Sequence, residues 1–449
     1  MSVQLDLPLN PGYITLDFFA GGGGASLGME FATGRPVDIA INHDPKALGM
    51  HRMNHPQTQH FRESVWDVDP IQACRGMHVK RAWLSPDCTH HSNARGCRPR
   101  DNNIRGLAWV AIRWMLEVRP EKLYLENVSE FRSWGPLNEV GKVIENRAGE
   151  TFQAFIKIMT TGLAEDHPAF LECLNFLGVK EGSSKASRMA KGLGYEVDYR
   201  ELRACDFGAP TTRSRFFLIA RNDKLPISWP EARYGEPDSC AVQSGKLRPW
   251  INSSQTVDWS IPVPSIFNRS KDLVDKTKKR IAKGIDRLVL GDDYYRLGPE
   301  ASGLCPSNPD DRKLSGFLKD YAIDRRVERK DGTYGFILKY YSQGGQWASL
   351  NEPMHTIPTK DRMALIYTKI ESGQIVDVGL RMFEPHELFA AQSFVKDYIH
   401  THYIDEDGEV RKLTKADSIR MCGNSVPPQL VAAIIRANEK NSPDRQSAA

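Results

Sequence analysis

One cysteine of this chain stands where a thiol could do chemistry. Cys88 lies in the segment Ser85–Ser92, directly after the short apolar run Ala82–Leu84, which predicts a strand. Open sheets of parallel strands bind their ligands at the carboxyl ends of the strands. A thiolate at that edge is a nucleophile if the site lowers its pKa from about 8.5. The alternative is a buried and inert cysteine.

Four glycines and a carboxylate follow two other strand-like runs. Gly21 to Gly24 stand between a predicted strand, Tyr13–Phe19, and a predicted helix, Ala25–Ala32. Glycines there let a ligand approach the backbone, and a helix N-terminus offers free N–H groups. Glu126 ends the predicted strand Lys122–Glu126, which would bring a carboxylate to the same edge. A tight turn and a solvated or capping carboxylate are the structural alternatives.

Zinc is a competing interpretation of the cysteine segment. Cys88, His90, His91 and Cys97 are four potential ligands within ten residues. Structural zinc needs four ligands that converge tetrahedrally, and adjacent histidines rarely both bind one ion. We therefore expect no metal, and interpret the segment as a polar loop.

The elements that must position these residues alternate between strand-like and helix-like segments, which predicts a doubly wound α/β sheet with helices on both faces. Tyr195–Leu202 and Arg215–Ala220 are joined by a short connection, which suits an antiparallel edge. Residues 141–194 exceed a simple crossover and predict extra helices. The further predicted elements are a strand at Val37–Ile41 and helices at Pro45–Met53, Leu107–Val118 and Pro428–Ala437.

Composition sets broad limits on function. The chain has 449 residues, 40% hydrophobic and 26% charged, and a formal net charge of +4, too small to mark a nucleic-acid binder by itself. No apolar run approaches the ~20 residues that span a bilayer. Eight cysteines without a CxxC pair, together with the absence of a secretory signal, predict reduced thiols in the cytoplasm.

The order of the motifs resembles the cytosine-5 DNA methyltransferase family, from about Tyr13 to Ala437. Three departures stand out: Asp87 precedes Cys88 where the family usually has proline, the acid expected after the second strand is not cleanly present, and Thr211 replaces the usual glutamine. We interpret Ser-Pro-Asp-Cys as the trait of a subfamily. The segments that match are Asp17–Gly24, Pro86–Ser92, Glu126–Val128, Arg213–Arg215, Leu380–Phe394 (through Arg381, Glu387 and Gln392) and Gly423–Val426.

The resemblance implies a fold and a division of the chain. The fold is an S-adenosylmethionine-dependent methyltransferase (Rossmann-like) sheet with a smaller inserted target-recognition domain. The methyltransferase domain would comprise residues 1–222, completed by 413–438. Target recognition would occupy 223–412, and 439–449 would form a flexible tail.

The resemblance also implies catalytic roles. Cys88 would attack carbon 6 of a cytosine flipped out of duplex DNA. Glu126 would contact ring nitrogen 3, and Arg215 the carbonyl oxygen. Arg213, placed with the catalytic residues, would make a phosphate or structural contact.

S-adenosylmethionine is the implied cofactor, and its candidate contacts come from four parts of the chain. The glycine motif contributes Phe19, Gly21, Gly23 and Gly24. Asp67 would face the adenine amino group. Asn42 or Asp44 would bind the ribose, with His43 stacking on adenine. Asn424 and Val426 would close over the methionine end.

Double-stranded DNA is the implied partner, with no membrane. Ser92, Arg95 and Arg98, after the cysteine, and the basic residues Lys278, Lys279 and Arg280 are candidate DNA contacts, although a charge run is often only a solvated face. We expect a cytoplasmic, nucleoid-associated monomer of prokaryotic or phage origin. A cognate restriction endonuclease is a partner that the activity would not require.

Three alternatives remain at this point. The same core could methylate cytosine in RNA. Asp87 beside Cys88 opposes thiolate formation, which favours an inactive DNA-binding homologue. A nicotinamide-dependent oxidoreductase would explain the glycines, but the loop lacks GxGxxG.

Overall fold

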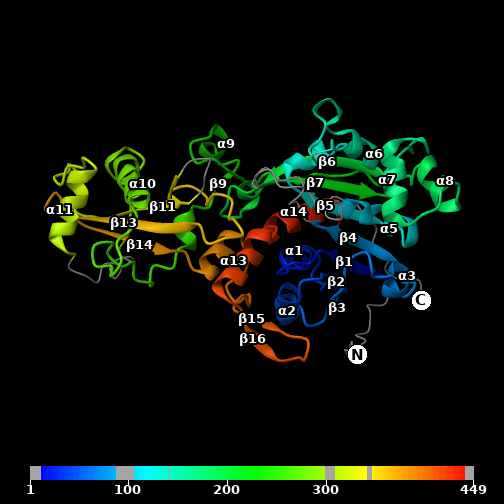
Figure 1. Cartoon of the computed structure of the whole chain (residues 1–449), viewed down its shortest axis with the longest axis horizontal. Helices are drawn as coiled ribbons and strands as arrows, with labels where there is room; N and C mark the ends of the chain where they lie inside the picture. The colour runs from blue at the N-terminus through cyan, green and yellow to red at the C-terminus, as the bar shows by residue number, and fades with distance from the viewer. Residues whose placement is uncertain (1–11, 87–105, 140, 299–308, 341–345, 440–449) are drawn as a thin grey trace.

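A seven-stranded sheet forms the centre of the larger part of the molecule (Figure 1). The computed structural model describes residues 12–86, 106–139, 141–298, 309–340 and 346–439. The strand order changes direction between β1 and β4, which is the switch point where open α/β sheets bind ligands. The strands lie in the order β3 (Gln59–Phe61), β2 (Ile39–Ile41), β1 (Ile14–Phe18), β4 (Val79–Leu84), β5 (Lys122–Asn127), β7 (Ser214–Arg221) and β6 (Glu196–Arg203).

Helices cover both faces of this sheet. Leu123 and Leu125 of β5 face one core, whereas Tyr124 faces the other, as the period of a strand requires. The first face is covered by α3 (Pro70–Cys74), α5 (Val110–Glu117), α6 (Glu150–Met159), α7 (Pro168–Leu177) and α8 (Ser184–Lys191). The second is covered by α1 (Gly24–Thr33), α2 (Pro45–Asn54) and α14 (Pro428–Glu439).

The predicted doubly wound sheet is confirmed, with its antiparallel edge: β7 runs antiparallel to both β5 and β6. The extra helices predicted for residues 141–194 are α6, α7 and α8. Strand β3 was not predicted, because it is only three residues long and begins with the polar pair Gln59 and His60. Among the described residues, no helix is both long and apolar enough to cross a membrane.

A second, antiparallel sheet forms the smaller part of the molecule (Figure 1). Its two longest strands, β13 and β14, have nine residues each and are joined by a tight turn. A separate hydrophobic core lies between this sheet and two helices. The elements are β10 (Tyr295–Arg296), β11 (Gly332–Lys339), β12 (Trp347–Ser349), β13 (Met363–Glu371) and β14 (Gln374–Met382), with α10 (Asp275–Ile285) and α11 (Asp311–Asp320).

A further hydrophobic cluster joins the two parts. It combines Leu27 and Met50 from the helices of the larger sheet with Leu365 of β13 and Phe389. The hairpin β15 (His402–Ile404) and β16 (Val410–Lys412) packs against α2. Between these elements lie α12 (Pro385–Ala391) and α13 (Lys415–Asn424). The domain boundaries at 222 and 412 stay predictions. The strand β15, which precedes residue 412, already packs on α2 of the larger part.

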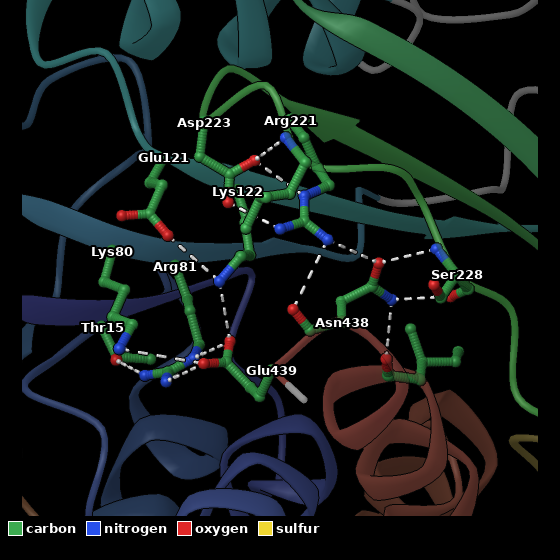
Figure 2. Close-up of polar contacts among 12 residues, drawn as sticks. Thr15, Lys80, Arg81, Glu121, Lys122, Arg221, Asp223, Ser228, Asn438 and Glu439 are labelled. Carbon is green, nitrogen blue, oxygen red and sulfur yellow. Dashed lines mark hydrogen bonds and ion pairs between the residues drawn. The ribbon is translucent and has the colours of Figure 1, made fainter. Parts of the chain in front are cut away.

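The end of α14 is anchored at the edge of the sheet where the parallel strands begin (Figure 2). Arg81 of β4 donates two hydrogen bonds of 2.8 Å to the carboxylate of Glu439, and Lys122 of β5 donates one of 3.2 Å. Arg221, the last residue of β7, donates to the side-chain oxygen of Asn438 at 3.3 Å. The three cationic side chains are buried.

The prediction of a flexible tail over 439–449 is therefore wrong for Glu439, which ends α14. Residues 440–449 lie outside the part of the chain that the structure describes. Glu439 is held because buried cations need a compensating charge. The sequence gives no local sign of this, because Arg81 and Lys122 stand far from Glu439 along the chain.

Replacing Glu439 with Gln should lower the free energy of unfolding by about 3 kcal/mol, because buried Arg81 would lose its carboxylate partner, although Lys122 would keep its ion pair with Glu121 at 3.0 Å. Glu371→Gln is the matched control: it breaks the more exposed pair with Lys369 and should cost less than about 1 kcal/mol. Urea unfolding of both variants measures the difference. Equal losses would contradict the role of this cluster.

Candidate active site

The carboxyl ends of β1, β4 and β5 meet at the edge of the large sheet that faces the smaller sheet (Figure 1). Ser85 and Pro86 continue from β4 and are bonded to both neighbouring strands. The Ser85 amide donates to the Phe18 carbonyl at 3.4 Å, and the Asn127 side chain donates to the Pro86 carbonyl at 3.4 Å. These two hydrogen bonds hold Ser85 and Pro86 in place. The two residues form the stem of the segment that contains Cys88.

Several predicted residues lie outside the described part of the chain. They are Cys88, Ser92, Arg95 and Arg98, together with His90, His91 and Cys97 of the alternative zinc set. Their roles stay predictions. Within the described ranges, no group of three or more His, Cys, Asp or Glu residues is placed to hold a metal ion.

Glu126 and Arg215 are brought together at this edge. Glu126 lies near the end of β5 opposite Phe217 of β7, and Arg215 is two residues from Phe217, on the same face. The Arg215 Nε atom lies 3.2 Å from Glu126 Oε1, and both side chains are largely buried. A carboxylate and a guanidinium next to the stem of the cysteine segment can bind a ligand that offers a donor beside an acceptor.

Arg213, the second predicted arginine, points elsewhere. It is buried, and its Nη1 atom donates to the Gly423 carbonyl at 3.1 Å. This bond joins the segment before β7 to the end of α13. Of the two interpretations considered for Arg213, these contacts favour the structural one.

The glycines of the loop differ in what surrounds them. A Cβ atom at Gly24 would lie 2.0 Å from Ser425 Oγ, and one at Gly23 would lie 2.1 Å from the Tyr398 hydroxyl oxygen. At Gly21 a Cβ would meet nothing within 4 Å. Gly21 is therefore the position that faces open space. Cofactor contact by Gly23 and Gly24 stays a prediction, since protein contacts alone explain both.

The end of β2 is arranged differently from the expected ribose site. Asp44 caps α2: its Oδ1 atom accepts from the amides of Lys46 and Ala47, and its Oδ2 atom lies 2.6 Å from Arg420 Nη1. Although burial opposes the shift, these partners hold the pKa of Asp44 below its ordinary value. Because both oxygens are engaged, Asp44 is the weaker of the two candidates.

Asn42 bonds to the Ala20 carbonyl at 3.0 Å and accepts from the Asp44 amide, and His43 is exposed. These contacts tie the end of β2 to the residue before the glycines.

The remaining predicted cofactor residues fall into exposed and packed groups. Asp67, beyond the end of β3, and Asn424, at the end of α13, are exposed. Val426 is buried against α1, and its carbonyl lies close to Gly24. Phe19 has a φ of 58°, which turns the chain sharply as it leaves β1.

The sequence analysis missed a buried line of polar side chains beneath the glycine loop. The Ser26 hydroxyl donates to Asp17 Oδ2 at 2.7 Å and lies 2.9 Å from His51 Nε2, and His51 Nδ1 lies 2.8 Å from His60 Nε2. Burial raises the pKa of Asp17 to about 7 and lowers the pKa of His60 to about 3. The available signal was a pair of histidines four residues apart, His51 on α2 and His55 directly after it.

The fold is a doubly wound α/β sheet whose carboxyl edge, where sheets of this kind bind ligands, faces a smaller antiparallel sheet (Figure 1). A model of the family "C-5 cytosine-specific DNA methylase" matches residues 13–161 and 184–440. The chain belongs to this family, which confirms the resemblance drawn from the motifs.

Single proteins that resemble this chain share less than a third of their residues with it over the matched region. The chain is 27% identical over 226 residues to the type II methyltransferase M.XorII of Xanthomonas oryzae, covering 49% of this chain and 43% of that one. It is 24% identical over 252 residues to M.AquIA of Picosynechococcus, covering 55% and 86%. A prophage-encoded DNA modification methyltransferase of E. coli superposes with a TM-score of 0.49 at 18% identity, covering 96% and 99%.

Asp17 should make stability depend on pH. Its raised pKa means that between its ordinary value of 3.8 and about 7 the folded state binds a proton that the unfolded state has released, so stability falls as pH rises across this range and the loss is complete above about 7. Asp17→Asn cannot ionise and keeps an acceptor for Ser26. From pH 5 to pH 7, its unfolding free energy should rise relative to wild type, by at most about 1.4 kcal/mol per pH unit. A constant difference would contradict the shift.

Proposed function

We propose that this chain transfers a methyl group from S-adenosylmethionine to carbon 5 of cytosine in double-stranded DNA. One observation carries the proposal. In a chain of the C-5 cytosine-specific family, the pair Glu126–Arg215 lies at the carboxyl edge of the sheet, beside the bonded stem of the cysteine segment. The roles of single residues below are part of this proposal.

The described residues fit this cofactor. Gly21 faces open space at the end of β1, next to the N-terminus of α1. Asp67 and Asn424 supply exposed polar groups after β3 and at the end of α13, and Asp67 would accept a hydrogen bond from the adenine amino group. When bound, the cofactor supplies an electrophilic methyl group.

The protein's part in the chemistry is to make carbon 5 nucleophilic. The Cys88 thiolate adds to carbon 6 of the extruded cytosine, and the electron density released into the ring makes carbon 5 enamine-like. Glu126 bonds to ring nitrogen 3 and Arg215 to the carbonyl oxygen, so that the charge developing on the ring is stabilised. Once carbon 5 has taken up the methyl group and the demethylated cofactor has been released as leaving group, loss of the carbon 5 proton to a base would break the carbon 6–sulfur bond and expel the thiolate.

Within the proposal, residues 1–222 with 413–438 form the catalytic domain and 223–412 the target-recognition domain. The chain acts as a monomer on nucleoid DNA in the cytoplasm. A cognate restriction endonuclease is a partner that the reaction does not require.

Activity of purified protein tests the proposal. Labelled methyl groups should enter duplex DNA and not transfer RNA, and Cys88→Ser should lower the rate at least about a thousandfold, because a hydroxyl is a far weaker nucleophile than a thiolate. Cys240→Ser, at an exposed cysteine elsewhere, is the matched control and should keep full activity. Incorporation into RNA alone would favour the RNA alternative, and equal activity of Cys88→Ser would overturn the proposed nucleophile.

A stripe of lysines on α10 is the proposed phosphate contact. Lys276, Lys279 and Lys283 are exposed and recur at helical spacing, so they share one face. Of the residues of this helix that were predicted to bind DNA, Lys278 and Arg280 are engaged within the protein. Lys278 lies 3.8 Å from the Asp275 carboxylate, and the Arg280 guanidinium lies 5.7 Å from the centre of the Tyr340 ring.

Changing Lys276, Lys279 and Lys283 together to Gln should weaken DNA binding and reduce the slope of log affinity against log salt by about 2 to 3, since each phosphate contact contributes about one unit. Lys157 of α6, Lys180 after α7 and Lys191 of α8 are exposed, and these three helices lie at the end of the larger part away from the smaller sheet (Figure 1). Their triple change to Gln is the control with equal loss of charge. Equal slopes for the two triple variants would remove α10 from the interface.

A further inference from the structure

Tyr398 reaches the glycine loop from a distant part of the chain. It follows α12 by seven residues and is separated from Gly22 by 376 positions, yet its hydroxyl donates a hydrogen bond to the Gly22 carbonyl. The side chain is buried, and its ring packs edge-on against Phe394 at 4.7 Å between centroids. This packing fixes the hydroxyl in place, so the hydrogen bond joins the loop to a rigid part of the core.

A polar chain supports the Tyr398 hydroxyl from behind. His55 Nε2 lies 3.2 Å from the hydroxyl oxygen, and His55 Nδ1 lies 2.8 Å from Glu30 Oε1. Glu30 belongs to α1, the helix that follows the glycines, and His55 is the residue that ends α2. The loop and both helices beside it are thus tied to one hydroxyl group.

The same hydroxyl limits the shape that the loop can take. Gly23 has a φ of +94°, and a Cβ there would lie 2.1 Å from the Tyr398 oxygen and 2.7 Å from His55 Nε2. The Gly22–Gly23 peptide is trans, so its N–H points away from the carbonyl that Tyr398 holds. Tyr398 therefore directs the N–H of Gly23 to the side of the loop opposite the tyrosine.

We propose that Tyr398 is a positioning residue that holds the loop Gly21–Gly24 in the conformation that binds S-adenosylmethionine. The inference rests on the proposed function, because it concerns the loop proposed to hold that cofactor. Tyr398 acts through the Gly22–Gly23 peptide. Its removal should therefore weaken cofactor binding and leave the chemical step intact once the cofactor is bound.

Calorimetric titration of the full-length protein with S-adenosylmethionine tests this directly. Tyr398→Phe should raise the dissociation constant about tenfold, the effect of one lost hydrogen bond to a buried carbonyl. Tyr195→Phe is the matched control, because Tyr195 is also buried and donates to a backbone carbonyl, that of Pro120 at 2.8 Å. It should bind S-adenosylmethionine within about twofold of wild type.

Steady-state kinetics separates positioning from a general loss of structure. Tyr398→Phe should raise KM for S-adenosylmethionine about tenfold and keep kcat at saturation within about twofold. His55→Gln, which leaves the bond to Gly22 in place, should raise KM less. Normal binding by Tyr398→Phe, or the same weakening in Tyr195→Phe, would overturn this inference alone. Wild-type protein that does not bind S-adenosylmethionine would overturn the proposed function as well.

Discussion

The fold depends on the neutralisation of three cationic side chains buried where the parallel strands begin. Arg81 and Lys122 share the carboxylate of Glu439, Lys122 also pairs with Glu121, and Arg221 pairs with Asp223 and bonds to Asn438. Charges buried without a partner are strongly destabilising, so the last turn of α14 is needed above all for Arg81. The C-terminal end of α14 is thus fixed where the parallel strands begin. Its N-terminal end lies at the opposite edge of the sheet, where these strands end.

The position of α14 has consequences for the glycine loop. The segment that leads into the helix places Ser425 and Val426 against Gly24, and α14 itself packs along α1. Arg213 adds a bond from the segment before β7 to Gly423. The first loop of the sheet is therefore shaped by some of the last residues of the chain. This explains why motifs from both ends of the sequence belong to one site.

Sequence predicted the parts of this arrangement that are encoded locally. Buried parallel strands such as β1 and β5 appear as apolar runs, and Asp44 followed by Pro45 is the usual start of a helix. Strand β3 is too short and polar to give a pattern. The contact of Tyr398 with Gly22 and that of Arg215 with Glu126 depend on tertiary packing and strand register, which spacing along the chain does not determine.

The central claim is that the thiol of Cys88 forms a temporary covalent bond with the target base. Duplex DNA in which 5-fluorocytosine replaces the target cytosine tests this most directly, because the fluorine cannot leave as the proton does and the adduct persists. With S-adenosylmethionine present, mass spectrometry of digested protein should find the modified base on the peptide that contains Cys88. Efficient methylation of DNA with no adduct, or an adduct on another cysteine, would contradict the account.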